Sequence, residues 1–204
     1  MPSKTLQAGG LVVAKALSGE NHLRLHVLSA EHGRLVCLWR RTQKMGGSGP
    51  DLFDQTDFKL EASSGGQTWF VKEYQLQYRH TGIAKRYRSL EQATRLGSFL
   101  WQNMLHAEFF EPMAQLANEA FHAFETLPLP YCIYLKSVYR FAREEGYPVR
   151  QQWMTHLPQR ERETAHDIIH KPLGEQSEHA ESESQELTVK LERWLRSETD
   201  IIVP

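Results

Sequence analysis

The chain has 204 residues, of which 40% are hydrophobic and 24% charged, with a formal net charge of −1 at pH 7. These values are near the averages of globular proteins and exclude a disordered or fibrous chain. No apolar run reaches the roughly 20 residues that cross a bilayer, and residues 1–10 lack the apolar core of a secretory signal. We therefore expect a folded cytoplasmic protein with no membrane partner.

The charge is distributed unevenly along the chain. Residues 1–110 hold 14 Lys/Arg against 9 Asp/Glu, whereas residues 111–204 hold 10 against 16. The N-terminal half is therefore the part better suited to meet phosphate groups. The two cysteines, Cys37 and Cys132, lie in apolar runs of different predicted elements, which indicates buried, reduced thiols and no disulfide framework.

Residues 1–80 alternate between apolar and polar side chains, as strands do. Leu23, Leu25 and Val27 alternate with Arg24 and His26, which directs the apolar set inward. Further strands are expected at 11–17, 33–41, 58–62 and 69–78, with Gly- and Ser-rich turns between them. Five strands in about 75 residues are typical of a small Greek-key barrel of the OB type.

After residue 82 the apolar period changes from two to 3.6 residues, which is typical of helices. One apolar stripe runs through Leu90, Ala93, Gly97, Leu100, Trp101 and Met104, and further helices are expected at 116–127, 131–145 and 185–196. Residues 174–184 are acidic and poor in apolar side chains, which predicts a mobile loop. The predicted fold class is α+β, with an OB-like five-stranded barrel domain at 1–80 followed by a helical bundle domain at 81–204.

Basic residues cluster at strand ends and at the junction between the two predicted domains. Cations neutralise phosphates and exposed rings stack on bases, which is what binding of single-stranded nucleic acid requires. The candidate nucleic-acid contacts are Arg24, Arg34, Arg40, Arg41, Lys44, Lys72, Tyr78, Arg79, Lys85, Arg86 and Arg88. For Trp39, Trp69 and Tyr74 we expect packing rather than base stacking.

The order of these features resembles the bacterial recombination mediator family RecO. The resemblance is carried by the strand turn at 28–34, the basic run after the third strand, the segments 51–53 and 58–61, and the helix end Glu144-Glu145-Gly146-Tyr147-Pro148. It implies an OB barrel, binding of single- and double-stranded DNA, and assistance to strand annealing or recombinase loading. The implied partners are a RecR-like protein and the acidic C-terminal tail of single-strand-binding protein.

The chain departs from this family at its zinc module. Many members carry four cysteines after the third helix, whereas no cysteine follows Cys132 here. His166 and His170, four residues apart on a helix, could chelate a metal with Asp167, His156 or His179. Ordinary exposed histidines are the alternative, and we expect neither a bound metal nor another cofactor.

Catalytic motifs are missing from the sequence. The segment Gly46-Gly47-Ser48-Gly49-Pro50 lacks the spacing of a nucleophile elbow and of a phosphate-binding loop. Glu144 and Glu145 diverge by about 100° on a helix and cannot act as an acid–base pair. We therefore expect a protein that is not an enzyme.

A protein-interaction adaptor, whose barrel no longer binds nucleic acid, is the alternative function. Lys136, Arg140 and Arg143 share one helical face and could grip an acidic peptide tail, with a solvated surface as the other interpretation.

Overall fold

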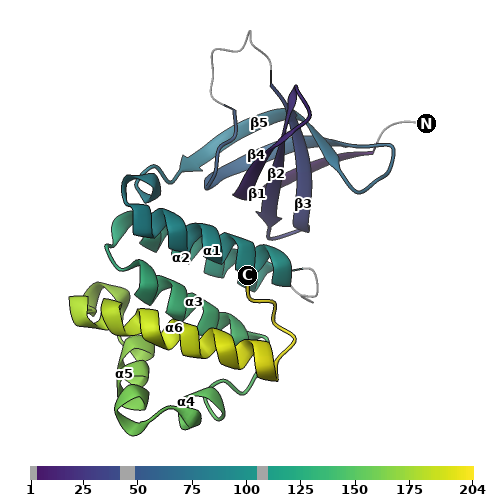
Figure 1. Ribbon diagram of the computed structural model, residues 1–204. Coiled ribbons are helices and arrows are strands. Elements are labelled where there is room, and N and C mark those ends of the chain that lie inside the picture. Colours follow the sequence, from purple (N-terminus) through teal and green to yellow (C-terminus); the bar gives the residue numbers. More distant parts are fainter. Residues whose placement is uncertain (1–3, 42–48, 105–109) are drawn as a thin grey trace. The chain divides into compact units, whose positions relative to one another are not determined.

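The computed structural model describes residues 4–41, 49–104 and 110–204 (Figure 1). The chain divides into two compact units. The barrel unit comprises residues 1–80 and 100–118, and the helical unit comprises residues 81–99 and 119–204. The first boundary coincides with the predicted one, but residues 100–118 belong with the barrel instead of the helical bundle. Lys44, a predicted DNA contact, lies outside the described residues.

The described residues of the barrel unit form five strands in the predicted order. They are β1 (Thr5–Ser18), β2 (His22–Ser29), β3 (Gly33–Arg40), β4 (Asp54–Ala62) and β5 (Trp69–Arg79). Their pairing closes the sheet into a barrel in the order β1-β2-β3-β5-β4. All pairs are antiparallel except β3 with β5, which run parallel where Cys37 and Leu38 meet Trp69 and Phe70.

The long strand β1 pairs with two other strands. Its first half pairs with β4, and its second half pairs with β2 after a bulge between Val12 and Ala14. A bulge bends a strand and increases its twist, so β1 can continue from one side of the barrel to the other.

The inward side chains fill the barrel with apolar volume. Ala8, Val12, Leu25, Val27, Leu35, Cys37, Phe58 and Leu60 are buried there. Trp39, Trp69 and Tyr74 are partly buried and pack against this cluster, as the sequence predicted. The alternation of Leu25 and Val27 with outward Arg24 and His26 is confirmed by their burial. The predicted α+β order, strands followed by helices, is confirmed.

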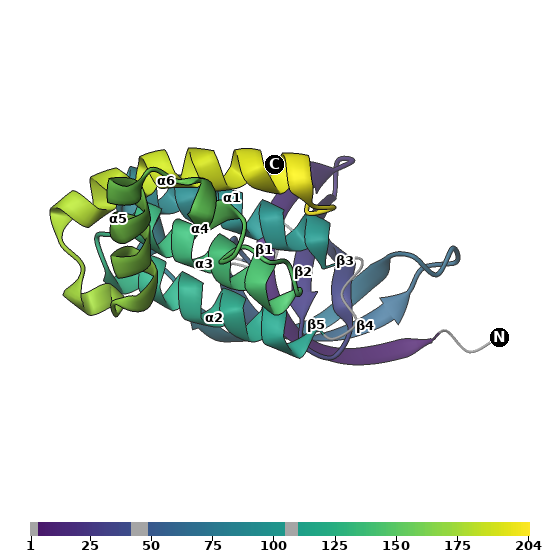
Figure 2. The same cartoon turned by 90° about the horizontal axis from the view of Figure 1, so that it is seen from below.

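The helices follow in the remaining chain. They are η1 (Ile83–Lys85), α1 (Tyr87–Asn103), α2 (Glu111–Thr126), α3 (Pro130–Glu144), α4 (Trp153–His156), α5 (Gln159–His170), η2 (Leu173–Glu175) and α6 (Glu178–Glu198). Figures 1 and 2 show α6 running alongside α3, with α5 also in contact with α6. Among the described helices, none combines the length and apolar character that crossing a bilayer needs.

The predicted mobile loop at 174–184 is wrong, because α6 already begins at Glu178. Ser177 caps this helix by accepting a hydrogen bond from the Ala180 backbone N–H at 3.2 Å, and acidic residues in the first turn favour the helix dipole. The Glu181 carboxylate also accepts the backbone N–H groups of Tyr131 (2.9 Å) and Cys132 (3.0 Å), at the start of α3. The acidic residues of this segment therefore stabilise the N-terminal ends of both α6 and α3.

Each unit contains one cysteine, and both side chains are buried as free thiols. Burial raises the pKa of Cys37 to about 12. Burial is also the main reason that the pKa of Cys132 is raised to about 12, although a contact of 3.1 Å with the Ser184 hydroxyl acts in the opposite direction. The predicted burial of both thiols is confirmed.

Candidate nucleic-acid interface

The outward side of β2 and β3 forms a cationic face on the barrel. In register, His22 lies opposite Arg40 and Arg24 lies opposite Leu38. Directly opposed residues of paired strands point to the same side of a sheet, so these side chains form one surface. Its members, which we call the cationic face, are His22, Arg24, His26, Arg34, Leu38, Arg40 and Phe70.

Small side chains and an exposed ring border this face. On β1, Ala14, Ala16 and Ser18 lie in register with His26, Arg24 and His22. On β5, Phe70 lies in register with Leu38, and its side chain is 37% exposed. The small side chains of Ala14, Ala16 and Ser18 project little from β1, so a planar ligand has room to lie against the strands beside the ring of Phe70.

Three predicted arginines on or beside this face are available to a ligand. Arg24, Arg40 and Arg41 are exposed, and within the described part of the chain they form no ion pair. The backbone N–H of Arg41 donates to the Asn21 carbonyl at 2.8 Å, which fixes the end of β3 beside the start of β2. These guanidinium groups can neutralise phosphates without first breaking an internal ion pair.

A stacked group covers the other end of the face. The ring of His26 stacks on Trp101 at 4.1 Å between centroids and 10° between planes, and the Arg34 guanidinium lies 4.4 Å from the centre of the indole. The pKa of His26 is lowered mainly by burial and to a smaller extent by the positive charges of Arg24 and Arg34. The sequence placed Trp101 on the apolar stripe of a helix and missed this role, because its contact with β2 depends on tertiary structure.

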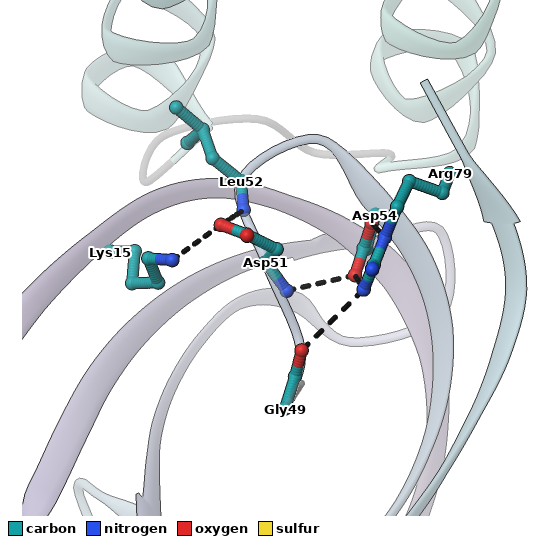
Figure 3. Close-up of polar contacts among 6 residues, drawn as sticks. All are labelled: Lys15, Gly49, Asp51, Leu52, Asp54 and Arg79. Carbon is teal, nitrogen blue, oxygen red and sulfur yellow. Dashed lines mark hydrogen bonds and ion pairs between the residues drawn. The ribbon is translucent and has the colours of Figure 1, made fainter. Parts of the chain in front are cut away.

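Arg79, a predicted DNA contact, holds a buried carboxylate in this structure. Its guanidinium holds the fully buried Asp54 carboxylate with two hydrogen bonds of 2.8 and 2.6 Å and also reaches the Gly49 carbonyl at 3.5 Å (Figure 3). Asp54 in turn accepts the backbone N–H of Asp51 at 2.8 Å. The hydrogen bond with Asp54 is the main reason that the pKa of Arg79 is raised.

Asp51 extends this arrangement to β1. Figure 3 shows its carboxylate between Lys15, with which it forms an ion pair, and the backbone N–H of Leu52 at 2.7 Å. Although burial opposes it, hydrogen bonding with these two groups lowers the pKa of Asp51. We call Lys15, Asp51, Asp54 and Arg79 the carboxylate clasp, because it ties the segment before β4 to both β1 and β5.

Two further predicted contacts on β5 already have partners. Lys72 forms an ion pair with Glu61 on the neighbouring strand β4, and both groups are exposed enough for this pair to be weak. The ring of Tyr78 is 45% exposed and meets the edge of His80 at 4.8 Å between centroids. Both side chains are exposed on β5.

The three predicted cations at the domain junction belong to the helical unit. Arg86 donates to the carbonyls of Phe124 (2.7 Å) and Glu125 (2.8 Å), so it caps the C-terminal end of α2. Arg86 therefore has a structural role, and its contact with DNA stays a prediction. Lys85 and Arg88 are exposed and form no ion pair within the described residues.

The cations of the predicted stripe on α3 already have partners within the protein. Lys136 donates to the carbonyls of Ile168, Ile169 and Lys171 at 2.6–3.0 Å, at the end of α5, and mainly burial lowers its pKa.

The second cation of the stripe has two carboxylate partners. Arg140 pairs with Glu119 (2.6 Å) and Glu144 (2.7 Å), while Arg143 is more exposed and lies 3.8 Å from Glu144. The geometry therefore does not favour the predicted grip on an acidic peptide by this stripe.

His166 and His170 lie on α5 as predicted, with stacked rings 4.1 Å apart. A ring nitrogen of His170 is hydrogen-bonded to the His166 carbonyl at 2.8 Å. In the described ranges, no three His, Cys, Asp or Glu side chains come together in a way that could hold a metal ion.

Comparison of the chain with protein-family models and with curated proteins gives no match. The functional assignment therefore rests on the cationic face and on the strand order of the barrel.

Proposed function

We propose that this chain is a non-enzymatic DNA-binding protein that binds single- and double-stranded DNA through the cationic face of an OB-like barrel. The observation that carries the proposal is the pair Arg24 and Arg40 on adjacent strands, beside the exposed ring of Phe70. Both arginines are exposed, and neither forms an ion pair with another described residue.

The topology of the barrel supports this choice of face. The closed order β1-β2-β3-β5-β4, with a parallel contact between β3 and β5, supports the proposal of an OB-like barrel. Such barrels bind oligonucleotides on the face of their second and third strands. The cationic face occupies this position in the present chain.

The chemistry of the face suits a nucleic-acid strand. Arginines attract the phosphate backbone, while the ring of Phe70 offers a π-face to any base. Within the RecO-like role, the expected activities are strand annealing and recombinase loading. A RecR-like protein and the tail of single-strand-binding protein remain the expected partners, with the tail bound elsewhere than on the α3 stripe, whose cations already have partners within the protein.

The double variant Arg24→Ala/Arg40→Ala tests the proposal. We expect it to bind a short thymidine oligonucleotide more weakly and to show a shallower dependence of log affinity on log salt, by roughly 0.7 per lost phosphate contact. Fluorescence anisotropy titrations at several salt concentrations measure both quantities.

A matched control removes the same charge from the helical unit. Arg160 and Arg193 are exposed, so Arg160→Ala/Arg193→Ala changes the net charge equally without touching the barrel. We expect its affinity and salt slope to stay near those of the wild type. Equal losses in the two double variants, or no binding by the wild-type protein at low salt, would contradict the proposal.

A further inference from the structure

The half-buried histidine of the cationic face lies between two arginines and an indole. Arg24 lies two residues before His26 on β2, and its side chain points to the same side of the sheet. Arg34 lies near His26 on the neighbouring strand β3. Among the residues that the structure describes, the other neighbours of His26 are Ala14 on β1, Val36 on β3 and Trp101 on α1, and none of them titrates. Within the same ranges, the charges that act on this imidazole are those of the two arginines.

We propose that His26 is the proton-linked residue of the cationic face, so that DNA binding draws one proton from solvent onto its ring and becomes tighter as the pH falls. This inference rests on the proposed function, because it requires phosphate to bind beside Arg24 and Arg34.

The direction of the effect follows from the geometry. In the free protein, burial and the two arginines disfavour the imidazolium form, and they lower the pKa of His26. A bound phosphate offsets the arginine charges and adds a negative charge near the ring. The pKa of His26 then rises on binding, and by linkage the affinity rises as the pH falls through the bound-state pKa.

Trp101 gives the ring a fixed position in both protonation states. The parallel stack at 4.1 Å holds the imidazole against the indole. An aromatic face attracts a cation, so the same contact favours the imidazolium once the arginine charges are offset. Trp101 is therefore a positioning residue for this proton.

Anisotropy titrations with the thymidine oligonucleotide at constant salt test the inference. We expect wild-type affinity to increase about three- to tenfold from about pH 8 to about pH 5.5, and the His26→Gln variant to lose most of this increase. A matched control is His32→Gln, at the turn between β2 and β3 and outside the cationic face, which should retain the increase. Trp101→Leu should reduce the increase while keeping the salt slope set by Arg24 and Arg40.

A direct measurement is the NMR titration of the His26 ring in free and DNA-bound wild-type protein. A bound-state pKa above the free-state pKa supports the inference, and an equal or lower one overturns it. If DNA binds but His26→Gln keeps the full pH dependence, only this inference fails. If the wild-type protein binds no DNA at any pH, the proposed function fails with it.

Discussion

Replacing Arg79 by Met should lower the free energy of unfolding by about 3 kcal/mol. The substitution leaves the Asp54 carboxylate fully buried without the guanidinium that makes two hydrogen bonds to it. An uncompensated buried charge is costly, because the protein interior solvates it far less well than water does. Urea-induced unfolding measures the change.

Two comparisons separate this effect from a general loss of surface charge. Lys72 lies on β5, as Arg79 does, and Lys72→Met removes an exposed ion pair with Glu61 on β4, which should cost less than about 1 kcal/mol. Adding Asp54→Asn to Arg79→Met should recover part of the lost stability, since a neutral amide is less costly to bury. Equal costs for Arg79→Met and Lys72→Met would show that the clasp contributes no more than a surface pair.

Replacing Arg95 by Leu should destabilise the helical unit by a similar amount, about 3 kcal/mol. Arg95 on α1 donates to the Glu192 carboxylate of α6 at 2.7 Å, and the side chain of Glu192 is only 7% exposed. The hydroxyl of Tyr134 on α3 donates to the same carboxylate at 2.8 Å. Loss of Arg95 leaves the buried Glu192 carboxylate with the hydroxyl of Tyr134 and with the more distant guanidinium of Arg196 at 4.0 Å.

The control for this variant is Arg140→Leu, which removes an arginine whose carboxylate partners lie on the surface. Its expected cost is below about 1 kcal/mol. Thermal and urea unfolding of the two variants, compared at the same pH, give the difference. A stability of Arg95→Leu that matches Arg140→Leu would mean that Glu192 finds other solvation in the folded state.

The strand pattern could be predicted because alternation is a local property of the chain. Leu25 and Val27 face the core and Arg24 faces outward whatever the strand pairing is, so periodicity alone identifies their sides. The helices α1, α2 and α3 were predicted for the same reason, since each buries one stripe. The start of α6 was missed because its acidic first turn is ordered by helix capping, which composition does not reveal.

The roles of the arginines could be predicted only in part. A sequence shows where a cation is, but its partner depends on tertiary structure. Arg24 and Arg40 were predicted as surface cations and are exposed, whereas Arg79 and Arg86 hold a buried carboxylate and two helix-end carbonyls. Arg79 and its partner Asp54 are 25 residues apart, and Arg86 lies 38 residues from Phe124.

The two buried cysteines provide a separate chemical reporter for each half of the molecule. A thiol with a pKa near 12 reacts slowly with alkylating reagents at neutral pH, and burial also blocks their access. Because Cys37 belongs to the barrel unit and Cys132 to the helical unit, mass spectrometry of alkylated peptides can time the opening of each unit without an engineered label. Arg79→Met should then accelerate alkylation of Cys37 more than that of Cys132, and Arg95→Leu should do the reverse.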